Sequence, residues 1–256
     1  MGCAPCGDLP EPTGVGAHAG RGAGRRPDPA RCQQDGRAWG VPQGVGRGGC
    51  SGAQGGAVFA LQAGWAPWPY PANVCVSINE VVVHGIPDGR VLEDGDLVTV
   101  DCGARLGGYC GGAAVSFMVG GGDEAGARLV ETTRVALERA IAQAVPGNRL
   151  GDVSSAVEET ARNAGYGIAD GSGGHGIGTE MHEDPPVPNT GRRGRGMRLR
   201  EGLTIAIEPL VTESGRDATV TLDDGCSVAT RDGSRAAHFE HSIAITGDGP
   251  VVLTAL

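Results

Sequence analysis

Residues 123–165, DEAGARLVETTRVALERAIAQAVPGNRLGDVSSAVEETARNAG, hold two helical patterns, and this pair decides the fold class. Asp123 is a typical helix N-cap, and apolar or small residues recur every three or four positions through residues 129–144. Pro146 and Gly147 then end the first helix, because proline lacks the backbone donor that a helix requires. A second, shorter helix is predicted over residues 152–164, with an apolar face formed by Val153, Val157 and Ala161.

Strand-like runs lie on both sides of this helix pair. β-Branched and other apolar residues dominate three runs before the helices and three runs after them. The runs are residues 74–83, 97–100 and 115–119, then 203–211, 218–222 and 239–245. Two helices inserted between sets of antiparallel strands predict an α+β fold.

The composition changes sharply near residue 70 and divides the chain into two predicted parts. Residues 1–72 contain 17 Gly and 9 Pro but only seven Leu, Ile, Val or Phe, well below the ~20% share of a folding chain. So few apolar side chains cannot offset the entropy cost of ordering, and this Gly/Pro/Arg-rich segment is predicted to be disordered. Its abrupt change into patterned sequence suggests a shifted reading frame or a misplaced start. Residues 73–256 form the predicted folded domain.

The bulk properties argue against several classes of protein. A net charge of −9 and a pI near 5.1 are atypical of nucleic-acid-binding proteins, which carry a basic face. No apolar stretch approaches the ~20 residues of a membrane span, and the N-terminus has no signal-peptide pattern. A cytoplasmic protein with reduced cysteines is therefore expected. Cys3 and Cys6 form a C-x-x-C without a second nearby pair, so zinc binding there is the less favoured interpretation.

Five short runs place ligand-type side chains at strand ends or beside glycines, where backbone and substrate can approach closely. The runs are VVHGIP (82–87), VTVD (98–101), GHGIG with HEDP (174–178 and 182–185), IAIEP (205–209) and HFEHS (238–242). They supply an oxygen-rich set of ligands: Asp101, His175, Glu208 and Glu240. Such a set suits a divalent ion, namely Mn, Fe, Co or Zn. Two further histidines, His84 and His182, could exchange hydrogen bonds with a substrate.

Each run predicts little alone, but in joint order and spacing the runs resemble the bacterial type I methionine aminopeptidases over residues 73–256. The resemblance implies the pita-bread fold of creatinases and aminopeptidases, with nominally two divalent metal ions on five ligands. Matched by motif, four of these ligands are Asp101, His175, Glu208 and Glu240. The substrate-facing histidines of the family match His84 and His182.

One metal ligand of the family pattern is missing from this sequence. The family's second Asp, which bridges both ions, falls on Gly112, eleven residues after Asp101. One ion would therefore keep three ligands, and the other would keep Asp101 and a share of Glu240. Cys110 lies nearby, but we do not expect its thiol to replace a carboxylate.

The methionine pocket and the N-terminus also depart from the family pattern. The family's aromatic residue before the last motif is Cys226 here. The family's N-terminal helices have no match in residues 1–72, so the first half of the fold is expected to be incomplete. The expected substrate-binding residues are Tyr70, Cys75, His84, Met181, His182 and Cys226.

The resemblance implies removal of N-terminal methionine from nascent polypeptides by water that a divalent metal activates. Glu208 would take up a proton, while His84 and His182 would stabilise the oxyanion or hold the peptide nitrogen. The expected partners are nascent-chain N-termini, including those at the ribosome, and the expected state is a monomer whose activity Gly112 impairs. Two alternatives stay open: an inactive relative that acts as a binding scaffold or is decaying, and an Xaa-Pro aminopeptidase, which the short chain disfavours.

Overall fold

The computed structural model describes residues 58–59 and 70–255. The predicted disorder of residues 1–72 therefore lies almost entirely outside the described residues. Two residues of that segment form strand β1 (Val58–Phe59), which pairs with β4 (Leu97–Leu106) in antiparallel orientation. In the described part of the chain, no helix is long and apolar enough to cross a membrane.

The largest sheet has nine strands, and all its recorded pairings are antiparallel. Its order is β1-β4-β5-β14-β9-β7-β8, with β2 also paired to β4 and β15 also paired to β14. The strands not yet located are β2 (Cys75–Ile78), β5 (Tyr109–Met118), β7 (Gly173–Gly176), β8 (Glu183–Pro188), β9 (Thr204–Ile207), β14 (Glu240–Thr246) and β15 (Gly249–Val252). This arrangement confirms the predicted α+β class.

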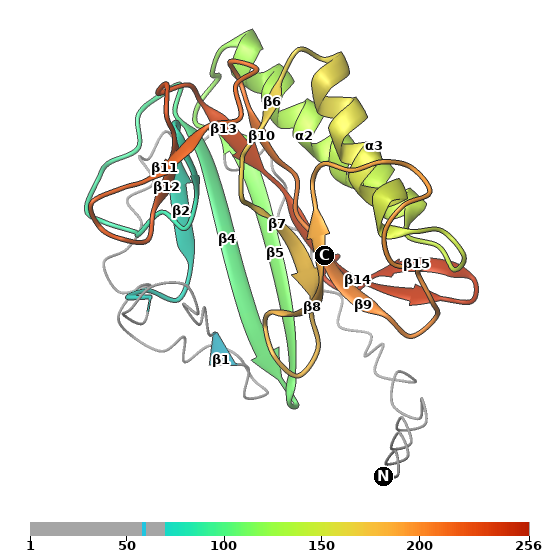
Figure 1. Cartoon of the computed structure of the whole chain (residues 1–256). Coiled ribbons are helices and arrows are strands. Elements are labelled where there is room, and N and C mark those ends of the chain that lie inside the picture. Colours follow the sequence, from blue (N-terminus) through green and yellow to red (C-terminus); the bar gives the residue numbers. More distant parts are fainter. Residues whose placement is uncertain (1–57, 60–69, 256) are drawn as a thin grey trace. The chain divides into compact units, whose positions relative to one another are not determined.

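Both predicted helices are present and lie side by side against one face of the sheet (Figure 1). Helix α2 (Glu124–Gln143) begins after Asp123, whose Oδ1 accepts a hydrogen bond from the Gly126 amide at 2.6 Å. The predicted N-cap is thus confirmed. Helix α3 (Leu150–Asn163) begins two residues before the predicted start, after Arg149.

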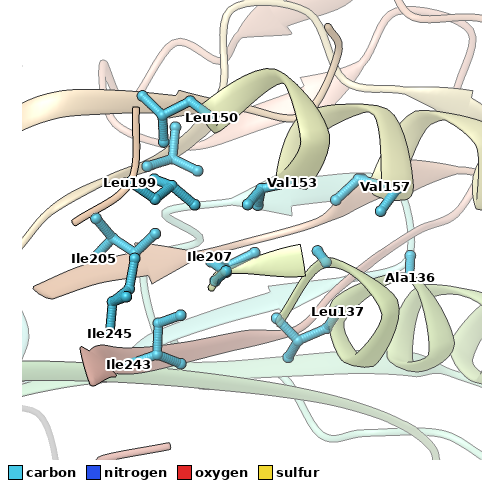
Figure 2. Packing of buried hydrophobic residues seen from close by; sticks show 14 of the residues in the cluster. Ala136, Leu137, Leu150, Val153, Val157, Leu199, Ile205, Ile207, Ile243 and Ile245 are labelled. Carbon is cyan, nitrogen blue, oxygen red and sulfur yellow. The ribbon is translucent and has the colours of Figure 1, made fainter. Parts of the chain in front are cut away.

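The main core lies between these helices and the neighbouring strands β9 and β14. Figure 2 shows Val153 and Val157 of α3 facing apolar side chains of the sheet. Those strand residues are Ile205, Ile207, Ile243 and Ile245, all at most 1% exposed. Because side chains alternate along a strand, the intervening positions point to the opposite face of the sheet. That face carries the candidate site.

Two runs predicted as single strands are each broken in the structure. The run 74–83 divides into β2 and β3 (Val81–Val83) at a turn, where Asn79 adopts a φ of 53°. The run 203–211 divides into β9 and β10 (Leu210–Thr212), and Glu208-Pro209 lies at the break. Proline cannot donate to a ladder, so the strand ends before it and the chain changes direction beside Glu208.

The broken ends join two small antiparallel sheets beside the large one. One sheet has the order β13-β10-β6, and the other has the order β11-β12-β3. Their remaining strands are β6 (Gly167–Ile168), β11 (Thr219–Thr221), β12 (Val228–Thr230) and β13 (Ala236–His238). Ile168 of β6, Leu210 of β10 and Val228 of β12 line the cleft that carries the candidate site.

Candidate metal centre and substrate cleft

A cleft of about 1070 Å³ opens on the face of the large sheet that the helices leave uncovered. All ten residues that the sequence predicts for metal or substrate line this cleft, together with Gly112. They come from segments between positions 70 and 240 and meet only through folding. The ten residues are Tyr70, Cys75, His84, Asp101, His175, Met181, His182, Glu208, Cys226 and Glu240.

Three of these side chains form a compact donor group. One ligand atom each from His175, Glu208 and Glu240 lies within 4.8 Å of the other two. The strands explain this proximity, because β9 pairs with β14 on one side and with β7 on the other. His175 lies on β7, Glu208 directly follows β9, and Glu240 begins β14.

Glycines let β7 come close enough to deliver His175. A Cβ on Gly174 would collide with the Ala206 carbonyl of β9, and one on Gly176 would collide with the Asp184 carbonyl. Only residues without side chains permit this approach on both sides of the strand. The same glycines weaken the strand pattern in the sequence, which is why β7 was not among the predicted strands.

The ring of His175 is oriented by the backbone. Its Nδ1 lies 2.7 Å from the Gly176 carbonyl oxygen, which can only accept, so Nδ1 carries a proton. Nε2 is then directed at the carboxylates, 3.2 Å from Oε1 of Glu208. Burial lowers the pKa of His175, but the hydrogen bond and charge of Glu208 outweigh it and leave that pKa raised. The Glu208 carboxylate therefore favours a positive charge next to it.

The buried carboxylates repel one another. Burial, reinforced by the charge of Glu208, raises the pKa of Asp101 to about 7. Burial also raises the pKa of Glu240 well above its ordinary value, and both Glu208 and Asp101 add to that shift. Among the described residues that line the cleft, none is Arg or Lys. Bound divalent cations would relieve this repulsion, so the donor set fits a metal centre.

Asp101 lies at the edge of this group, and Gly112 lies beside it. In the β4–β5 ladder Asp101 pairs with Ala114, and Gly103 pairs with Gly112. Asp101 is not part of the group whose ligand atoms lie within 4.8 Å of one another. A Cβ on Gly112 would lie 2.5 Å from Oε1 of Glu240, so the Glu240 carboxylate fills the space that a larger residue would use.

The Cys110 side chain lies outside the cleft. The β4–β5 ladder continues in register from Cys110 to Gly112, without a bulge. The Cys110 thiol nevertheless points to the Thr179 carbonyl oxygen, 3.7 Å away, and the residue is not among those that line the cleft.

The two histidines that the sequence predicts to face substrate, His84 and His182, line the same cleft as the donor group. The rings of His182 and His175 are tilted by 58° with centroids 4.3 Å apart. Burial lowers the pKa of His182 to about 4, and the nearby His175 and His84 add to the effect. Burial also lowers the pKa of His84. Both rings are therefore neutral near pH 7 and can each donate one hydrogen bond and accept another.

The cleft has a wall of sulfur and aromatic side chains. The hydroxyl of Tyr70 donates to the Gly85 carbonyl oxygen at 2.7 Å, which fixes the ring at the cleft. Burial raises the pKa of Cys75 to about 12, with the charge of Asp101 adding to it, so the thiol stays protonated. Met181 and Cys226 complete the set of predicted pocket residues. Such a lining suits an apolar, polarizable side chain.

The structure adds His238, to which the sequence analysis gave no role. This residue ends β13, is 1% exposed, and places Nε2 3.9 Å from Oε2 of Glu208. Burial lowers its pKa to about 3, with His84 contributing, so the ring is neutral. Its position two residues before Glu240 in the HFEHS run is the sequence signal that could have pointed to it.

Comparisons with known proteins point in one direction. The model of metallopeptidase family M24 matches residues 53–247. Methionine aminopeptidase 1 of Mycobacterium tuberculosis is 52% identical over 192 residues, which cover 72% of each chain. Methionine aminopeptidase of Clostridium acetobutylicum is 48% identical over 186 residues, which cover 72% of this chain and 74% of the relative.

Solved structures agree with the sequence comparisons. The crystal structure of methionine aminopeptidase from Thermotoga maritima has a TM-score of 0.72 at 48% identity, covering 73% of this chain and 76% of that one. Prolidase from Pyrococcus furiosus has a TM-score of 0.58 at 26% identity, covering 72% of this chain and 49% of that one.

Proposed function

The chain belongs to metallopeptidase family M24, among the methionine aminopeptidases, and we propose that its cleft removes the N-terminal methionine of polypeptide chains. It has the pita-bread fold of that family and is a metallo-exopeptidase. The observation that carries the proposal is the donor group His175, Glu208 and Glu240, with two neutral histidines at the same cleft.

The donor group is the proposed principal metal site. A divalent cation there, drawn from Mn, Fe, Co or Zn, supplies Lewis acidity and lowers the pKa of water. Glu208 is the proposed proton acceptor, because its carboxylate lies beside Nε2 of His175, one of the proposed metal-ligand atoms. Asn189 steadies the backbone at this point by donating to the Glu208 carbonyl oxygen at 2.7 Å.

The neutral histidines are the proposed substrate contacts. His84 and His182 line the cleft and can each donate a hydrogen bond to a developing oxyanion or accept one from a peptide nitrogen. The methionine side chain would contact the wall formed by four lining residues, namely Tyr70, Cys75, Met181 and Cys226. A buried, protonated Cys75 favours this apolar contact over ligation of a metal.

A second ion would be held weakly. Asp101 and a share of Glu240 are its proposed ligands, and Gly112 supplies no side chain. With one carboxylate fewer, the site offers the second ion fewer ligands and less negative charge, so its affinity for that ion is lower. We therefore propose an enzyme with one firmly bound ion and reduced activity. Its proposed substrates are nascent chains, including those at the ribosome. We propose a monomeric enzyme that acts in the cytoplasm.

Gly112 also favours a second candidate function. A relative that has lost a bridging carboxylate could keep the fold as a binding scaffold without catalysis. The retained histidines and glutamates of the cleft oppose this interpretation, because a scaffold does not require a buried group of mutually repelling carboxylates.

Metal content and methionine release, measured on the same protein, separate the two candidates. After purification in Mn²⁺ we expect about one tightly held ion per chain, and slow methionine release from a Met-Ala-Ser peptide that rises with added Mn²⁺. Glu208→Gln should abolish release, since its amide cannot take up the proton. The matched control Glu201→Gln, on an exposed turn, should behave as the wild type. An ion-loaded wild type without release at any Mn²⁺ concentration would establish the scaffold.

A further inference from the structure

His238 is a polar side chain that packing alone does not explain. Within residues 70–255, its Nδ1 and Nε2 are the buried side-chain nitrogen or oxygen atoms that lack a hydrogen-bond partner. The other residues of β13, Ala236 and Ala237, are buried and apolar. An apolar side chain at position 238 would avoid leaving two polar atoms unpaired, so the imidazole is retained at a cost to stability.

Hydrogen bonds to one side chain anchor the backbone of His238. Its amide donates to the Ser116 hydroxyl at 2.8 Å, and that hydroxyl lies 2.8 Å from the His238 carbonyl oxygen. Across the small sheet, His238 pairs with Leu210, two residues after Glu208. The backbone of His238 is therefore held against β10, the strand that begins directly after Glu208 and Pro209.

The two oxygens of Glu208 are approached by two different imidazoles. Nε2 of His175 lies 3.2 Å from Oε1, and Nε2 of His238 lies 3.9 Å from Oε2. The second distance exceeds an ordinary hydrogen bond of ~2.9 Å by about 1 Å, which a turn of the carboxylate can close. His238 is not a member of the donor group, so it is not placed to bind a cation jointly with those ligands.

We propose that His238 is a positioning residue, whose Nε2–H donates to Oε2 of Glu208 and holds Oε1 toward His175 and the bound cation. The inference rests on the proposed function only in giving Glu208 its two roles, as metal ligand and as proton acceptor. Outer groups that orient a ligand carboxylate change metal affinity and reactivity without touching substrate.

Two substitutions separate positioning from packing. His238→Leu keeps an apolar fill, while His238→Gln restores an N–H donor near the position of Nε2. By isothermal titration of the full-length protein, His238→Leu should bind Mn²⁺ about tenfold more weakly. Its kcat for the Met-Ala-Ser peptide should fall while KM stays near the wild-type value. His238→Gln should recover most of both losses, and the metal-free His238→Leu protein should melt no lower than wild type.

Thr133→Val is the matched control for replacing a buried polar group. Thr133 is fully buried in α2, and its hydroxyl donates to the Leu129 carbonyl oxygen within the same helix. This variant should keep wild-type Mn²⁺ affinity. The proposal is overturned by a folded His238→Leu protein with wild-type affinity and kcat, or by a His238→Gln protein no better than His238→Leu.

A measurement on the wild type decides the case even where the leucine variant does not fold. In ¹⁵N-histidine-labelled protein titrated with Zn²⁺, His238 should be protonated at Nε2, with assignment by comparison with His238→Gln. Protonation at Nδ1 alone would overturn the proposal, because Nε2 could not then donate to Glu208. A protein that binds Mn²⁺ yet releases no methionine would contradict the proposed function, while the affinity and tautomer results would still decide the role of His238.

Discussion

Gly112 faces Gly103 across the β4–β5 ladder, and the Glu240 carboxylate occupies the space above its Cα. Backbone shifts are unfavourable here, since the Gly112 amide donates to the Ser242 hydroxyl at 2.9 Å. The nearest obstacle to a side chain at position 112 is the far end of Glu240, which can swing away. A substitution at this residue therefore has two separable effects: it displaces Glu240, and it adds or does not add a ligand.

Gly112→Asp and Gly112→Ala separate these effects. Gly112→Asp should raise bound Mn²⁺ from about one to about two ions per chain and increase methionine release, because a carboxylate returns to the cleft. Gly112→Ala should displace Glu240 without compensation and lower Mn²⁺ affinity below that of wild type. Atomic absorption and peptide assays on all three proteins provide the check. Equal metal content and equal activity in wild type and Gly112→Asp would contradict the argument.

At the scale of elements, one side chain connects helix α3 to the segment that enters the cleft. Asp217 binds both terminal nitrogens of Arg162 at 2.6 Å and accepts from the Ile168 amide at 2.9 Å. Ile168 ends β6, and residues 168–174 line the cleft. Asp217 thus holds the entry to β7, and through it the position of His175, against α3.

Asp217→Asn should lower the free energy of unfolding by about 1 kcal/mol at pH 7, a modest value because both partners are partly exposed. The hydrogen bonds from Arg162 hold the pKa of Asp217 below its ordinary value. A depressed pKa contributes stability that is present above the unfolded-state pKa near 4 and lost as the pH falls below it.

Urea unfolding of Asp217→Asn and wild type at pH 7 and pH 3 tests the link. The difference between the two proteins should shrink at the lower pH, since the Asp217 carboxylate of the unfolded wild type is then largely protonated and unfolding is coupled to proton uptake. Glu159→Gln, which breaks the exposed pair with Arg193, is the control and should change stability little. A difference between wild type and Asp217→Asn that is constant with pH would refute the assigned role of the Asp217 charge.

At the scale of the whole molecule, the family match begins at residue 53, within the segment whose composition predicts disorder. Strand β1 pairs with β4 at residues 58–59, ahead of the predicted boundary at residue 73. Residues 1–52 lie outside both the family match and the described structure.

Removal of residues 1–52 should change the free energy of unfolding by less than about 1 kcal/mol, because their few apolar residues cannot form a core. Removal of residues 1–60 should cost more, since it also deletes β1. Urea unfolding of both truncated proteins, with hydrogen exchange on the full chain, measures this. A cooperative unfolding unit within residues 1–52 would contradict the prediction of disorder.

Sequence alone determined those features that depend on near neighbours. Helix α2 and its N-cap at Asp123 follow from a period of 3.6 and a side chain three residues from its partner amide. The order of the HGIP, GHGIG, IEP and FEH motifs likewise indicates the family from the sequence alone. The prediction that Gly112 stands at a ligand position also needs the sequence alone, since it depends on counting eleven residues from Asp101.

Only the tertiary structure decided the contacts between distant residues. The occupation of the Gly112 space by Glu240, and the approach of His238 to Glu208, join positions on different strands and sheets. The strands β7 and β8 were not predicted, because the glycines of β7 and the prolines of β8 have low strand propensity. The pairing of β7 with β9 overrides that low propensity. Such contacts depend on strand register and on side-chain packing across the sheet, and neither leaves a periodic signal in the local sequence.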